Sequence, residues 1–271
     1  MKVLGIGDNV VDKYVHLKTM YPGGNALNFS VFAKKLEVEA AFIGVFGDDR
    51  EAHHVEKTLR EIGIDISRSR HCKGENGCAR VTLENGDRVF LGSNEGGVTR
   101  LNPLKLDEED RAYIRTFSVM HTGLYSHTGH LLPELRSLGV PISFDFSDDF
   151  EDEQVERYIP YADFAFFSCS HLSDEATREY IQAKWKREGQ FTIATRGSER
   201  SMVYDGSRFY YQSPAFVEAV DTMGAGDSFI AAFLLSYLKD HDIQIAMREG
   251  ARFAAESCLT EGSFGFGVPF E

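Results

Sequence analysis

Two kinds of apolar segment alternate along the chain. Short apolar runs at residues 3–7, 40–46 and 164–167 are typical of buried strands, and longer stretches between such runs repeat apolar residues at helical spacing. The alternation continues without a repeat or a low-complexity linker. It predicts an α/β fold, a doubly wound and mostly parallel sheet in one domain over residues 1–271.

One segment interrupts the α/β series. Residues 78–83 and 88–91 are strand-like, and the Asn85-Gly86 pair between them is a strong hairpin signal. A hairpin inside an α/β series belongs to a separate layer. We therefore expect a second, smaller layer of strands that includes this hairpin.

Composition narrows the classes of function. A chain with 42% hydrophobic residues can bury a large core, and a net charge of -13 argues against nucleic-acid or anionic-membrane binding. None of the four cysteines forms a Cys-x-x-Cys pair, and no apolar run approaches the ~20 residues that span a bilayer. A strand begins almost at once, without a signal peptide, so we expect a cytoplasmic protein.

The most informative stretch lies just before an apolar helix expected at residues 228–238. Gly224, Ala225 and Gly226 carry no bulky side chains, so the backbone N–H groups at this helix start are exposed. Together with the helix dipole they form a site for an anion, most naturally a phosphate. Asp227 follows directly, where a carboxylate is costly for phosphate binding.

Asp227 has two interpretations. Asp is a good helix N-cap, and for an isolated Asp we would favour that role. Here the neighbouring glycines, and Asp221 six residues upstream, favour a general base that acts beside a transferring phosphoryl group.

Polar residues near the N-terminus form a second candidate site. Asp12 follows the first strand, in the position where open α/β sheets bind ligands, although an ordinary turn is an equal alternative. Gly23 and Gly24 allow close backbone approach, and Asn28 lies one turn into the next helix. Asn25 alone would be interpreted as an N-cap.

The seven residues 221–227 match the Asp-Thr-x-Gly-Ala-Gly-Asp signature of the ribokinase/PfkB family of sugar and nucleoside kinases. Residues 23–26, Gly-Gly-Asn-Ala, also resemble the sugar-binding loop of that family. The resemblance implies a ribokinase-like fold with a small β lid formed near residues 13–21 and 72–98. It also implies transfer of the ATP γ-phosphoryl to a sugar hydroxyl. The catalytic residues it implies are Asp227 with the backbone of Gly224, Ala225 and Gly226.

The same resemblance assigns ligand contacts. Sugar contacts are implied for Asp12, Gly24, Asn25 and Asn28, with Arg88 and Glu95 of the lid as further candidates for which a solvated turn is an equal alternative. Nucleotide contacts are implied for Thr195, Gly197, Asp221 and Thr222. Mg²⁺ is expected with the ATP phosphates, K⁺ near Asp221, and a homodimer through the lid.

The chain departs from the family pattern in three places. Ser147 replaces an Asn, Ser168 and His171 replace an Asn-x-x-Glu pair linked to magnesium, and Arg200 stands where a Gly is usual. The metal ligands are therefore not predicted, and Arg200 either reaches a phosphate or points to solvent.

Within the family the chain is most similar to a subgroup that phosphorylates fructosamines such as fructoselysine. A kinase for another ketose or a nucleoside, and a catalytically silent sugar- or nucleotide-binding relative, are the alternatives. The intact Asp227 argues against a silent relative, and the missing Asn-x-x-Glu pattern argues for one.

Overall fold

The computed structural model describes residues 1–84, 87–148 and 151–270. No side chain of residues 83–88 is described, so the predicted substrate contact Arg88 lies outside the described side chains.

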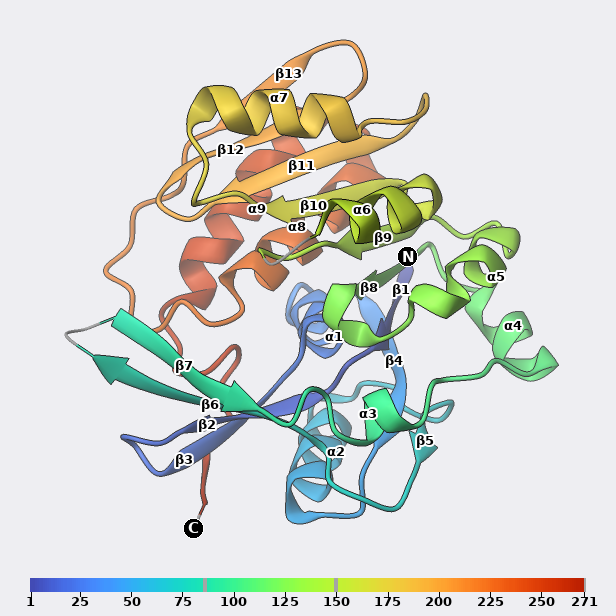
Figure 1. Ribbon diagram of the computed structural model, residues 1–271, viewed down its shortest axis with the longest axis vertical. Coiled ribbons are helices and arrows are strands. Elements are labelled where there is room, and N and C mark those ends of the chain that lie inside the picture. The colour runs from blue at the N-terminus through green and yellow to red at the C-terminus, as the bar shows by residue number, and fades with distance from the viewer. Residues whose placement is uncertain (85–86, 149–150, 271) are drawn as a thin grey trace.

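A nine-stranded sheet forms the centre of the molecule (Figure 1). β1 pairs in parallel with β4 on one side and with β8 on the other, and only β12 and β13 run antiparallel to their neighbours. The predicted large and mostly parallel sheet is confirmed. In spatial order its strands are β13 (Phe209–Gln212), β12 (Glu199–Tyr204), β11 (Phe191–Arg196), β10 (Phe164–Ser168), β9 (Ile142–Asp145), β8 (Val119–Gly123), β1 (Lys2–Gly7), β4 (Glu39–Phe46) and β5 (Arg70–His71).

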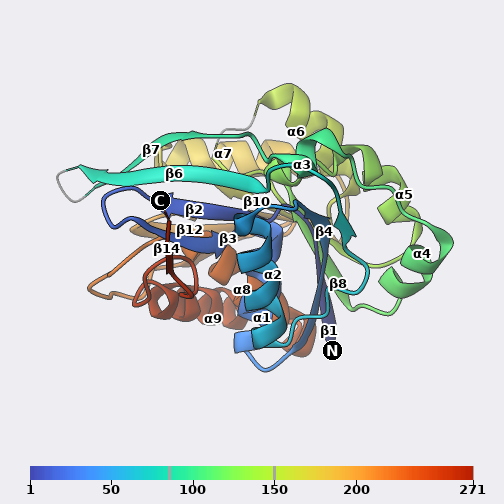
Figure 2. The ribbon, with the colours of Figure 1, turned by 90° about the horizontal axis from the view of Figure 1, so that it is seen from below.

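Helices cover both faces of this sheet (Figure 2). Alternate strand residues enter two separate cores, as Val3 and Leu4 do in β1, which explains why the strands are apolar throughout. One face packs against α1 (Asn25–Lys35), α2 (Arg50–Ile62), α8 (Ala225–Asp240) and α9 (Ile243–Ser257). The other packs against α3 (Val98–Leu101), α4 (Glu108–Ile114), η1 (Leu124–Ser126), η2 (Gly129–Leu131), α5 (Leu132–Ser137), α6 (Asp152–Tyr158), η3 (Ile159–Tyr161) and α7 (Asp174–Lys184).

A second sheet stands beside the first and forms the lid layer (Figure 1). Its order is β14 (Val268–Pro269), β3 (Thr19–Gly23), β2 (Val10–Tyr14), β6 (Gly77–Glu84) and β7 (Asp87–Ser93). The strands begin earlier than the expected residue 13, and Asp12 lies within β2, not in a turn. β14 comes from the C-terminal segment, to which the sequence assigned no role.

An exposed connection of residues 213–220 joins β13 to Asp221. Phe216 within it is 98% exposed, so this segment crosses the surface without entering either core. Among the described residues, no helix is long and apolar enough to cross a membrane.

The topology places the ligand site. The chain passes from β1 to β4 on one side of the sheet and later continues through β8, β9 and β10 on the other side. The reversal at β1 and β8 creates a crevice outside their carboxyl ends, where open α/β sheets bind ligands.

Candidate active site

The start of α8 has the geometry of an anion site. Gly224 is the N-cap with φ 74°, and a Cβ on it would lie 2.8 Å from the Ser263 side chain, so this position requires glycine. A Cβ on Gly226 would meet no described atom within 4 Å. The first turn of α8 is therefore open on the side where its backbone N–H groups lack helical partners.

Asp227 lies in the first turn of α8 and not at its cap. Its carboxylate accepts hydrogen bonds from Asn25 Nδ2 at 2.8 Å and from Asn28 Nδ2 at 2.6 Å. Because Gly224 occupies the cap, the N-cap interpretation of Asp227 is wrong. Two amides from α1 instead fix the direction of its carboxylate.

The start of α1 is held by an acidic residue that the sequence analysis did not select. Asp8, just past β1, accepts hydrogen bonds from the backbone N–H groups of Asn25 at 2.6 Å and Ala26 at 3.2 Å. Gly24 is the N-cap, with φ 114°, and a Cβ there would lie 2.9 Å from Asp8. The alternative of Asn25 as N-cap is therefore wrong, and its side chain is available to the site.

The Asn25 side chain joins two carboxylates. Its Nδ2 donates to Asp145 at 2.9 Å as well as to Asp227, while its Oδ1 lies 3.0 Å from His121 Nε2. Carboxylates only accept hydrogen bonds, so the amide nitrogen must face them and His121 must donate to the amide oxygen. His121 is buried, which lowers its pKa to about 3 and keeps the ring neutral.

Both carboxylates bind protons more tightly than ordinary aspartates. Burial raises the pKa of Asp145 to about 7, and the negative charge of Asp227 adds to the effect. Burial also raises the pKa of Asp227 to about 6, against the opposing hydrogen bonds from Asn28 and Asn25. A carboxylate with a pKa just below neutrality is well matched to general-base catalysis.

Asn28 carries an unused acceptor. Its Nδ2 is occupied by Asp227 and by Ser263 Oγ at 3.1 Å. Its Oδ1 is buried and has no hydrogen-bond partner among the described residues. A buried acceptor is costly to leave unpaired, so a donor from a ligand would stabilise it.

Asp221 connects the lid layer to the loop before α8. The hydroxyl of Tyr14 in β2 donates to it at 2.6 Å, and the N–H groups of Met223 and Gly262 donate at 3.0 and 2.9 Å. Asp12 lies in the same lid strand and is buried. A Cβ on Gly23 would lie 2.5 Å from the Asp12 carboxylate, which places Asp12 against the Gly23-Gly24 turn.

The other predicted nucleotide residues lie farther along the same sheet edge. Thr195 lies next to the last residue of β11, opposite Ser168 of β10, and its carbonyl accepts from Cys169 N–H at 2.8 Å. Gly197 has φ 59° in the turn after β11. Thr222 is exposed in the loop before α8, and its carbonyl accepts from Ala225 N–H at 3.3 Å.

Arg200 is engaged with a carboxylate. It forms an ion pair with Asp174, which also pairs with Arg196. The guanidinium lies 4.5 Å from the centre of the Tyr211 ring. Asp174 is thus paired with two arginines. In the described part of the chain, no group of three or more His, Cys, Asp or Glu side chains could hold a metal ion.

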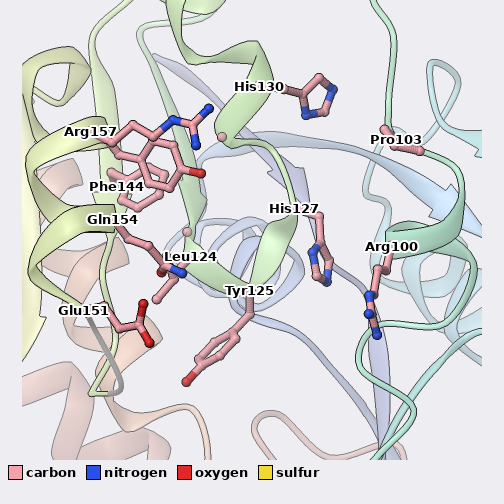
Figure 3. A pocket seen from close by; sticks show the side chains of 13 residues that line it. Arg100, Pro103, Leu124, Tyr125, His127, His130, Phe144, Glu151, Gln154 and Arg157 are labelled. Atoms are coloured by element: carbon pink, nitrogen blue, oxygen red, sulfur yellow. The ribbon is translucent and has the colours of Figure 1, made fainter.

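Glu95 contacts two residues that line a cavity. Its side chain pairs with Arg100, and its carbonyl lies 3.2 Å from His127 Nε2. Arg100 and His127 both line this cavity (Figure 3).

The geometry therefore brings Gly24, Asn25, Asn28, Gly226 and Asp227 together and adds residues that the sequence reasoning missed. Asp8 follows β1 and Asp145 ends β9, so both lie at the carboxyl edge of the sheet, and that shared position is a signal that could have selected them. His121 gave no such signal, because a single buried histidine in a strand is usually structural.

Residues 3–266 match the model of the pfkB family of carbohydrate kinases. The chain belongs to this family. It is therefore a carbohydrate kinase, as the sequence predicted.

Similar proteins agree with this class. The chain is 41% identical to fructosamine kinase FrlD of Bacillus subtilis (strain 168), over 100% of this chain and 95% of that protein. It is 34% identical to fructoselysine 6-kinase of Escherichia coli (strain K12), over 97% of this chain and 100% of that protein.

Solved structures show the fold. An Arabidopsis thaliana ribokinase complexed with ribose and ATP superposes with a TM-score of 0.81 at 18% identity, covering 97% of this chain and 94% of that one. The predicted ribokinase-like fold is confirmed.

Proposed function

We propose that the protein transfers the γ-phosphoryl group of ATP to the 6-hydroxyl of a fructosamine such as fructoselysine. Identity of 41% and 34% to a fructosamine kinase and a fructoselysine 6-kinase supports this substrate over a plain ketose or a nucleoside. The observation that carries the chemistry is the Asp227 carboxylate, held by Asn25 and Asn28 beside the open first turn of α8.

The sugar would lie against the start of α1. The buried, unpaired Oδ1 of Asn28 offers an acceptor for a sugar hydroxyl, and Asp12 beside the Gly23-Gly24 turn offers a carboxylate from the lid layer. Gly24 and Asn25 complete this wall, and Arg88 and Glu95 remain proposed contacts.

Asp227 would act as the general base. It takes the proton of the 6-hydroxyl as that oxygen bonds to the γ-phosphorus, while the bond from phosphorus to the ADP oxygen breaks. The N–H groups of Gly226 and Asp227 in the first turn would stabilise the charge that develops on the transferring group. A silent binding protein would have no use for a base held in this way.

ATP would bind along the carboxyl edge of the sheet, with Thr195, Gly197 and Thr222 as proposed contacts. Mg²⁺ would arrive as part of the MgATP substrate, and its charge offsets that of the phosphates. The carboxylate of Asp221 accepts hydrogen bonds from three donors, which supports a role in holding the loop and the lid layer together. K⁺ near Asp221 stays a proposal.

ADP release tests this function. With MgATP, we expect fructoselysine to be a better acceptor than fructose, ribose or adenosine, and Asp227→Asn to reduce kcat by about 10²–10⁴-fold. If fructose or adenosine is the better acceptor, the kinase assignment stands and the fructosamine assignment fails. If none of the four is phosphorylated and Asp227→Asn equals the wild type, the catalytic assignment is wrong.

Two further expectations also stay proposals. A homodimer through the lid is supported by Phe90 and Leu91 on the edge strand β7, which are 63% and 50% exposed, and light scattering would test it. A cytoplasmic location is supported by the free thiols of Cys72, Cys78 and Cys169.

A further inference from the structure

A cavity of about 750 Å³ has Gly123, a neighbour of Asn25, in its wall, and Figure 3 shows the side chains that line it. It lies between the segment after β8, the α3 region and helix α6, and Tyr125, Arg157 and Glu151 are among its lining residues. Its volume falls within the range of about 300–1,000 Å³ that is typical of small-molecule sites.

The cavity begins one side chain away from Asp227. Gly123 lines it, and a Cβ on Gly123 would lie 2.6 Å from Asn25 Oδ1 and 3.1 Å from the Asp145 carbonyl oxygen. Asn25 in turn donates to Asp227 at 2.8 Å. The cavity and Asp227 are therefore linked through Asn25, and a substrate long enough to reach both would have to pass this side chain.

The cavity carries opposite charges on one short helix. Glu151 is the N-cap of α6 and Arg157 lies in its last turn, about 9 Å farther along at a rise of about 1.5 Å per residue. The Arg157 guanidinium lies over the Tyr158 ring, 5.7 Å from its centre. Among the described residues no ion pair engages Arg157 or Glu151, whereas the charge of Arg100 is paired with Glu95.

A plain sugar could meet these two side chains only through its hydroxyls, because it has no charge to pair with either of them. The amino-acid part of a fructosamine has a carboxylate and cationic nitrogens, and a guanidinium binds a carboxylate through two parallel hydrogen bonds. We propose that the cavity binds the amino-acid part of the substrate, and this inference rests on the fructosamine kinase activity proposed above. Arg157 then pairs with its carboxylate, and Glu151 faces a cationic nitrogen.

The test compares fructoselysine with 1-deoxy-1-pentylaminofructose, which keeps the sugar and the secondary amine but lacks the carboxylate and the α-amine. We expect the wild type to have a KM about tenfold lower for fructoselysine, because a hydrogen-bonded charge pair contributes about 1.4 kcal/mol or more. Arg157→Gln should remove this difference by raising the KM for fructoselysine alone, with kcat nearly unchanged.

Matched variants distinguish the loss of the proposed Arg157 contact from a non-specific loss of activity. Arg157→Lys keeps the charge but loses the paired hydrogen bonds, so it should restore part of the preference. Arg115→Gln, at an exposed arginine that ends α4, should keep the wild-type preference. Glu151→Gln should raise the KM for fructoselysine and leave that for fructose unchanged.

The failures of the two proposals are distinguishable. Equal KM values for both fructosamines in the wild type, or an unchanged preference in Arg157→Gln, would overturn the amino-acid site while the kinase still phosphorylates fructosamines. Phosphorylation of fructose without phosphorylation of either fructosamine would instead overturn the proposed function and the amino-acid site with it.

Discussion

The side-chain amide of Asn25 lies 2.8 Å from the carboxylate of Asp227, across 202 positions of sequence. This contact connects the starts of two helices, α1 and α8, that pack side by side on one face of the sheet. The same amide nitrogen also bonds Asp145 at 2.9 Å, so one asparagine organises two acidic groups of the site.

Removing this amide should shift the pH dependence of the reaction. Hydrogen bonds to an ionised carboxylate lower its pKa, so Asn25→Ala should raise the pKa of Asp227 above its present value of about 6. The acidic limb of kcat/KM against pH should then move to higher pH by about one unit.

Asn28→Ala removes the other donor to Asp227 and should move the limb in the same direction. Gln244→Ala, at a surface amide of α9, is the control and should leave the profile in place. An unmoved limb in both Asn variants would mean that Asp227 is not the group that titrates.

Asp145 should make the folded protein less stable as the pH rises. Its pKa of about 7 in the folded state lies above the unfolded value of about 3.9, so the protonated form stabilises the fold at low pH. That contribution is lost as the pH rises through 7.

In Asp145→Asn this loss is absent. The free energy of unfolding of both proteins is measured by thermal unfolding at pH 5 and at pH 8. The value for the variant minus the value for the wild type should be larger at pH 8 than at pH 5 by about 1–3 kcal/mol. A constant difference between the two proteins would contradict a raised pKa at this position.

Two glycines at the start of α8 should respond in opposite ways to substitution by alanine. Gly226 is a helical residue, and a Cβ on it would meet no described atom within 4 Å, so Gly226→Ala should keep or raise stability. The added methyl group should obstruct the proposed phosphoryl site and lower kcat. Gly224 has φ 74° and would place a Cβ 2.8 Å from Ser263, so Gly224→Ala should lower the melting temperature. Full activity in Gly226→Ala would argue against phosphoryl transfer at this turn.

The hydroxyl of Tyr14 should stabilise the attachment of the lid layer. It donates to the buried Asp221 at 2.6 Å, and a hydrogen bond to a charged group contributes about 1.5–3 kcal/mol. Tyr14→Phe should lower the free energy of unfolding in urea by an amount in that range.

Tyr21→Phe provides the comparison in the neighbouring strand. Its hydroxyl bonds the exposed Glu261 at 2.7 Å, so the loss should be smaller. Equal losses in the two variants would show that the Asp221 contact has no special role.

The sequence predicted the parts of the site that are local in the chain. The Gly-Ala-Gly-Asp turn at a helix start, the Gly-Gly turn before α1 and the order of strands and helices all follow from neighbouring residues. The contacts between these parts did not follow, because no local pattern indicates that Asn25 meets Asp145 and Asp227. The role of the C-terminal segment was missed for the same reason, since β14 pairs with β3 only in the folded chain, where Val268 lies opposite Met20.

The exposed connection at residues 213–220 separates the chain into two pieces of unequal length, and each piece carries part of the group formed by Asn25, Asp145 and Asp227. Asn25 and Asp145 belong to the longer piece, whereas Asp227 and the turn before it belong to the shorter one. Cleavage within this connection would leave two fragments that are inert by themselves, and phosphorylation would return only where the fragments meet. The chain could thus be divided at this connection to make a fragment-complementation reporter. In such a reporter each fragment is fused to one of two partner proteins, and the association of the partners is measured as enzyme turnover.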